Sequence, residues 1–133
     1  MQDRPSAIEL LEALGAFLRE EVAPRLDGGL RFKALVGANV AGIVAREIAL
    51  GPVQDRAQTE RLWRLLGRAG TPPADGDFAA LSRELSYELT RRICEGDADA
   101  GPWRVEVMEH LREAVKEKLA VDNPKLLAGE QQH

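Results

Sequence analysis

RFKALVGANVAGIVAREI, residues 31–48, is the stretch of sequence that decides the predicted fold. Its inner part, residues 34–45, has no charged residue and a single polar side chain, that of Asn39. Bulky apolar residues fill most of the stretch. Between them, alanines recur at steps of three and four, which places them on one helical face: Ala34, Ala38, Ala41 and Ala45. Other helices can pack against the bulky side and approach closely over the alanines. The pattern therefore predicts a central, nearly buried helix.

Apolar residues at helical spacing predict further helices on both sides of this stretch. Ser6 and Glu9 have the spacing of a capping box at the start of the first helix. Gly51-Pro52 is a typical stop signal after the central helix, and Asn123-Pro124 ends the last one. We therefore predict an all-α fold, a compact bundle of about five helices around the central apolar second helix. The expected helices cover about residues 7–22, 31–50, 55–67, 77–96 and 102–122.

The length and composition set further bounds. A chain of 133 residues fits one domain, which we place at residues 3–124, followed by a polar, frayed tail at residues 125–133. The net charge of -4 argues against general nucleic-acid binding, and a single cysteine excludes an intramolecular disulfide. The N-terminus lacks the features of a signal peptide. The uncharged stretch at residues 34–45 is shorter than the roughly 20 residues that span a bilayer. We expect a soluble, cytoplasmic protein that binds neither membrane nor nucleic acid.

No recognisable catalytic or metal-binding constellation is present in the sequence. His110 and His133 lie far apart, without the short ligand spacings of zinc sites. His110 has glutamates within one turn and is expected on a solvated helical face. Cys94 falls near a helix C-terminus, where the dipole does not activate a thiol, so it is expected to be a small buried hydrophobe. We predict no catalytic residue, no metal ligand and no cofactor, and we favour a protein that is not an enzyme.

Two groups of polar residues remain as ligand-binding candidates. Gly28-Gly29 precedes Arg31 and Lys33 at a helix N-terminus, where free N–H groups attract anions; solvated cations beside a glycine linker are the plainer interpretation. Asn39 and Arg46 lie two turns apart on one side of the central helix, roughly 10 Å along its axis. Buried there, they would need polar partners. An internal polar network is favoured over the floor of a pocket between helices.

Three aromatic residues are candidates for an interface with another protein. Trp63, Tyr87 and Trp103 fall slightly off the apolar faces of their predicted helices. Aromatic side chains at such margins either cover the edge of a core or anchor a protein–protein contact. The sequence favours neither interpretation.

Three segments resemble a bacterial family of unknown function: RPSAIELL at residues 4–11, LRFKALVGANVAGIVARE at 30–47 and KLAVDNPK at 118–125. Members of that family are small helical domains found beside, or fused to, phosphotransferases of the aminoglycoside/choline-kinase type, often near acyl-CoA dehydrogenase genes. The resemblance implies an accessory domain and not the kinase, because the kinase's glycine-rich loop and catalytic aspartates are missing here. It nominates no catalytic residue. The positions that it does nominate are Arg31, Lys33, Asn39, Arg46, Glu47, Asp122 and Asn123.

Two functional hypotheses follow. The first is a non-catalytic accessory or interaction domain, whose partner is a phosphotransferase-like enzyme or a second copy of the chain. The second is a small-molecule binding domain for a phosphorylated or CoA-type ligand, which would use Gly28-Gly29, Arg31, Lys33 and Arg46. The surroundings of the central helix distinguish the two hypotheses. A small-molecule site would require a concave, polar-lined pocket beside Asn39 and Arg46.

Overall fold

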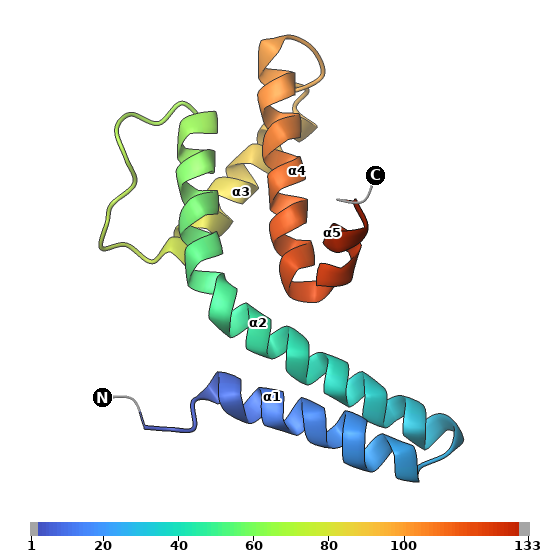
Figure 1. The fold of residues 1–133 in the computed structure, drawn as a ribbon. Helices are drawn as coiled ribbons and strands as arrows, with labels where there is room; N and C mark the ends of the chain where they lie inside the picture. The colour runs from blue at the N-terminus through green and yellow to red at the C-terminus, as the bar shows by residue number, and fades with distance from the viewer. Residues whose placement is uncertain (1–2, 131–133) are drawn as a thin grey trace. The chain divides into compact units, whose positions relative to one another are not determined.

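The computed structural model describes residues 3–130, and every regular element in that part of the chain is helical. The predicted all-α fold class is therefore confirmed. Figure 1 shows the elements in chain order: α1 (Ala7–Phe17), a π-helical turn η1 (Leu18–Val22), a 3₁₀ turn η2 (Ala23–Arg25), α2 (Gly28–Leu65), α3 (Phe78–Cys94), α4 (Pro102–Asp122) and α5 (Pro124–Glu130).

The described chain divides into two compact units. One, the hairpin unit, consists of residues 3–51 and 120–130, and the other, the three-helix unit, consists of residues 52–119. Helices α2 and α4 each contribute residues to both units. The prediction of a single domain at residues 3–124 is not tested by this division and stays a prediction.

In the hairpin unit, α1 packs against the first part of α2 through small residues (Figure 1). The capping box forms as predicted, with the Ser6 N–H donating to Glu9 Oε2 at 2.8 Å and the Glu9 N–H donating to Ser6 Oγ at 3.2 Å. Gly15 of α1 is buried, and a Cβ at that position would lie 3.4 Å from the Ala38 carbonyl oxygen. The predicted small face of the central helix is the buried one, since Ala38, Ala41 and Ala45 are almost inaccessible to solvent.

The bulky side of α2 is exposed, which contradicts the prediction of a nearly buried helix. Five large apolar residues, spaced four apart, form a stripe that we call the α2 stripe: Phe32, Val36, Val40, Val44 and Ile48. Phe32 is 67% exposed and Val40 is 50% exposed. The physical reason is that close packing of α1 over the alanines buries only one side of α2. Within the hairpin unit, the α2 stripe is left exposed.

The predicted break at Gly51-Pro52 is also wrong, because α2 continues through Pro52 as one helix of 38 residues. Gly51 is absent from the glycines that adopt the positive φ typical of a helix-ending glycine. Pro52 removes one helical N–H but leaves the rest of the ladder in place. Asp55, where a separate helix was expected to begin, lies inside α2, and its carbonyl accepts a 2.7 Å hydrogen bond from Thr59 Oγ1. The dipeptide marks the boundary between the two compact units and does not end the helix.

The three-helix unit has its own core. Leu62 of α2, Leu85 and Leu89 of α3 and Val107 of α4 are buried together. The side chain of Thr59, fully buried, lies 3.1 Å from the Phe78 carbonyl oxygen and ties α2 to the start of α3. Asp77 caps α3, accepting from the Ala80 N–H at 3.1 Å. These contacts fix the positions of the polar residues that α2 and α4 carry within this unit.

A further helix follows the predicted end of the last one. α4 ends at Asp122, in agreement with the predicted stop, but Pro124 then begins α5, which runs to Glu130. Proline is favourable in a first helical turn because its missing N–H would have no partner there. Residues 125–130 are thus helical, residues 131–133 lie outside the described part, and the frayed tail at residues 125–133 stays a prediction.

Helix α2 is long and apolar enough to cross a membrane, judged by length and composition alone. Its most apolar window of 18 residues has a mean hydropathy of 1.4. The sequence-based expectation that the apolar stretch is too short is therefore wrong. Core helices of soluble proteins have the same properties, so a cytoplasmic location without membrane contact stays a prediction.

Candidate functional site

A pocket of about 300 Å³ in the hairpin unit collects most of the polar residues nominated by the sequence. We call it the Arg46 pocket. Its lining comes from η1, α2, the end of α4 and α5, and consists of Arg19, Asn39, Arg46, Asp122, Asn123, Pro124 and Lys125. Three cationic side chains therefore face one carboxylate and two amides. Among residues 3–129, no carboxylate lies within 4.0 Å of these cations.

The position of the Arg46 guanidinium depends on one hydrogen bond and on the space beside Gly42. Its Nε donates to the Val121 carbonyl oxygen at 2.7 Å, at the end of α4. The absence of a side chain at Gly42 leaves room for it, because a Cβ there would lie 3.2 Å from Arg46 Nη1. The carbonyl bond uses one of the five N–H donors of the guanidinium. The remaining donors have no protein acceptor among residues 3–129, so Arg46 presents positive charge to the pocket.

The structure brings together only part of the predicted site. Asn39, Arg46, Asp122 and Asn123, four of the positions that the resemblance nominated, line the Arg46 pocket. Asn39 is exposed and Arg46 is half-buried, so the predicted internal polar network is wrong. The reason is that both residues lie at the edge of the packed alanine face. Outside the pocket and exposed to solvent are Arg31, Lys33 and Glu47.

Two lining residues, Arg19 and Lys125, were missed by the sequence. Lys125 lies in the motif at residues 118–125, but it was assigned to the frayed tail. The start of α5 at Pro124 is the signal that would have identified it. Arg19 carries no sequence signal, because its position depends on the π-helical turn η1. Such turns are rare and frequently occur at functional sites.

A second pocket, of about 440 Å³, lies in the three-helix unit between α2 and α4. We call it the His110 pocket, and its lining consists of Arg61, Arg64, Leu65, Glu106, Glu109, His110 and Glu113. His110 is only 6% exposed. The prediction of a solvated histidine is therefore wrong: the neighbouring glutamates of the pocket lining are exposed, whereas His110 is buried on the side of α4 that faces α2.

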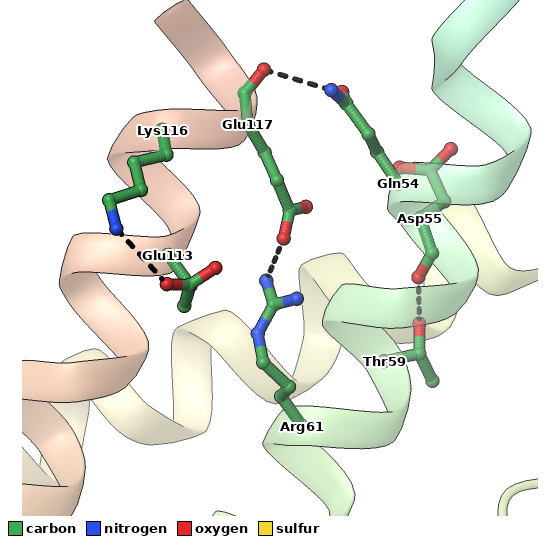
Figure 2. Close-up of polar contacts among 7 residues, drawn as sticks. All are labelled: Gln54, Asp55, Thr59, Arg61, Glu113, Lys116 and Glu117. Atoms are coloured by element: carbon green, nitrogen blue, oxygen red, sulfur yellow. Dashed lines mark hydrogen bonds and ion pairs between the residues drawn. The ribbon is translucent and has the colours of Figure 1, made fainter. Parts of the chain in front are cut away.

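Two buried nitrogens in this pocket lack hydrogen-bond partners within the described chain, His110 Nδ1 and Arg61 Nε. Arg61 nevertheless forms an ion pair with Glu117, which Figure 2 shows crossing from α2 to α4. Close by, Gln54 Nε2 donates to the Glu117 carbonyl oxygen at 2.9 Å, a second link between the same helices (Figure 2). Burial lowers the pKa of His110 from its ordinary value of 6.5, and the positive charge of Arg61 lowers it further.

This shift predicts a specific pH dependence of stability. Because the pKa of His110 is lower in the folded than in the unfolded chain, the unfolded chain binds more protons just below pH 6.5. The free energy of unfolding should therefore be highest above the unfolded pKa and fall as the pH drops from 6.5 toward the folded pKa. Urea unfolding at a series of pH values measures this slope. His110→Gln should flatten it, whereas the control Glu84→Gln, at an exposed position of α3 outside the His110 pocket, should keep it. An unchanged slope in His110→Gln would contradict the assignment.

The three aromatic interface candidates differ in their surroundings. Trp63 and Trp103 are half-buried against the core of the three-helix unit. Their indole N–H groups donate to the carbonyl oxygens of Ala69 at 3.1 Å and Leu65 at 2.9 Å, respectively. Both therefore cover a core edge. Tyr87 is 70% exposed on α3 and remains available to a partner.

No cluster of three potential metal-ligating side chains (His, Cys, Asp or Glu) is placed to hold an ion anywhere in residues 3–130. Cys94 is exposed at the end of α3, so the prediction of a buried hydrophobe is wrong. Its helix turns the thiol away from the core because Leu85 and Leu89 define the inner side. The two pockets are thus the sites whose chemistry is of interest, and neither contains a thiol.

Comparison with known proteins identifies the family to which this chain belongs. No curated protein and no solved structure matches the chain. One family profile matches residues 24–126, described as "Domain of unknown function (DUF6285)". The match covers most of the chain, including α2, α3 and α4 in full. The chain therefore belongs to the DUF6285 family of domains of unknown function.

Proposed function

We propose that this chain is a non-catalytic interaction domain that self-associates through the α2 stripe. The observation that carries the proposal is the exposure of this stripe on a helix whose other side is tightly packed. The stripe runs from Phe32 to Ile48, roughly 24 Å along the helix. Contiguous apolar surface of this kind marks a protein contact or a membrane contact.

The order of residues in the stripe favours a second copy of the chain as the occupant. Val40 is the midpoint of the stripe, with Val36 and Val44 four residues away on either side, and Phe32 and Ile48 eight residues away. Two copies of α2 that cross antiparallel at Val40 would therefore pair Val36 of each copy with Val44 of the other around a central Val40–Val40 contact. Phe32 and Ile48, each turned by roughly 80° around the helix axis from Val40, would flank the crossing. Such a contact has two-fold symmetry, and each copy presents the same surface to the other.

The charged residues beside the stripe fit the same arrangement. Lys33 and Glu47 are each seven residues from Val40, in opposite directions. Antiparallel pairing about Val40 would place Lys33 of one copy opposite Glu47 of the second copy. Both side chains are exposed, and neither forms an ion pair within the described chain. Opposite charges at matching positions fix register and orientation between helices.

A charged residue at the midpoint tests the proposal most directly. Val40→Glu would place two carboxylates opposite each other at the symmetry axis, and like charges at a contact cost several kcal/mol. We expect the parent chain to be dimeric and Val40→Glu to be monomeric in sedimentation-equilibrium measurements. The matched control is Val105→Glu, the same change at an exposed position of α4, which should leave the dimer intact.

Charge exchange adds a second arm to this experiment. Lys33→Glu and Glu47→Lys should each weaken the dimer, and the double variant should restore it because opposite charges then face each other again. Restoration is specific to pairing between identical copies. A parent chain that stays monomeric at every accessible concentration would contradict the proposal.

Two other occupants are distinguished by the same samples. The resemblance described above implies a phosphotransferase-like partner. If the chain is monomeric but forms a stoichiometric complex with such an enzyme, and Val40→Glu abolishes that complex, the occupant of the α2 stripe is the enzyme and not a second copy. Sedimentation of the monomer with phospholipid vesicles would instead identify the stripe as a membrane contact. Either result overturns the self-association proposal.

A further inference from the structure

We propose that the Arg46 pocket binds a small dianion of the phosphate monoester class. This inference does not depend on the proposed self-association, because the lining of the Arg46 pocket contains no residue of the α2 stripe. It depends on three observations: the convergence of cations, the positioning of Arg46 and the size of the pocket.

The convergence of cations is the first observation. Arg19, Arg46 and Lys125 come from η1, α2 and α5, so the fold and not local sequence brings them together. Asp122 is the one carboxylate in the lining. Like charges repel, and without an ion-pair partner among the described residues the three cations lack compensation. An anion with two negative charges would balance the excess.

The positioning of Arg46 is the second observation. The bond from its Nε to the Val121 carbonyl oxygen holds the guanidinium before any ligand arrives, so less conformational freedom is lost on binding. A planar guanidinium with free N–H donors recognises phosphate oxygens in a two-pronged geometry. The amides of Asn39 and Asn123 add neutral donors at the same opening.

The size of the pocket limits the ligand class. About 300 Å³ is at the small end of the range for ligand sites. It accommodates a phosphate group with a short substituent and not a dinucleotide. A carboxylate monoanion would leave one positive charge uncompensated, which is why a phosphate monoester is preferred.

The test is a titration of the full chain with inorganic phosphate and with pyrophosphate at constant ionic strength, followed by two-dimensional amide NMR and by calorimetry. We expect saturable shifts confined to residues around the Arg46 pocket. Arg19→Ala and Lys125→Ala should each weaken binding about three- to tenfold, because each removes one exposed charge contact. Asp122→Asn should strengthen binding, because it removes the carboxylate that repels the anion.

The matched control is Arg31→Ala, which removes the same charge from an exposed position on α2 outside the pocket. It should leave the affinity within twofold of the parent, which excludes a diffuse electrostatic effect. Shifts spread evenly over exposed basic residues, or an Arg19→Ala variant with parental affinity, would overturn the proposal. Vesicles containing phosphatidic acid form a final arm: binding to them with no response to free phosphate would assign the surface to lipid and also overturn the small-ligand proposal.

Discussion

Leu62→Ala is expected to lower the free energy of unfolding of the protein by about 2–5 kcal/mol. Leu62 is the largest fully buried side chain, and it contacts the core of the three-helix unit formed with Leu85, Leu89 and Val107. Its truncation removes the transfer free energy of the lost carbons and leaves a cavity. Three helical segments enclose the site, so the surrounding structure cannot easily collapse into the space.

Urea unfolding followed by tryptophan fluorescence measures this loss. Both tryptophans, Trp63 and Trp103, are packed against the same core and therefore report on this unit. The matched control is Leu111→Ala on α4, at an exposed position, where the loss should be less than half as large. Equal effects of the two substitutions would show that Leu62 is not the centre of the core.

The fold class was predictable because the local signals agree with the tertiary structure. Ser6 and Glu9 form the expected capping box, Asp77 caps α3, and Asp122 ends α4. Each of these signals acts within one turn of helix, so its physical effect depends little on the rest of the chain.

The predictions that failed concern competition between local preference and packing. Gly51-Pro52 costs helical stability locally, yet α2 continues because residues on both sides are packed, Ala45 in one unit and Thr59 in the other. The helical period located the two faces of α2 correctly but did not show which would be covered. His110 illustrates the same limit, since neighbouring glutamates suggested exposure while the rotation of α4 buries the imidazole.

The candidate site was partly predictable for a related reason. Asn39 and Arg46 interrupt an apolar stretch, so their polar character is visible in the sequence, and the structure places both at one pocket. Two more residues of this pocket, Asp122 and Asn123, were nominated by the resembling segment at residues 118–125. Arg19 was not predictable, because a surface arginine in a helix has no distinctive pattern until a π-helical turn places it at the opening.

The second large loss of stability is expected for Ala38→Leu, because Ala38 lies where α1 packs against α2. Ala38 is 1% exposed, and its carbonyl oxygen would lie 3.4 Å from a Cβ at Gly15. There is no room for the three additional carbons of leucine unless the two helices separate. Overpacking of this kind typically lowers the free energy of unfolding by about 1–3 kcal/mol.

Far-UV circular dichroism is the appropriate measurement, because both tryptophans lie in the three-helix unit and do not report on the hairpin unit. Ala49→Leu, the same change at an exposed position of the same helix outside the α2 stripe, is the matched control and should change stability by less than about 0.5 kcal/mol. Ala38→Leu with parental stability would mean that α1 does not pack on the alanine face in solution. In that case the exposed side of α2 would no longer be distinguished from the buried one, and the basis for assigning the α2 stripe to a second copy would be lost with it.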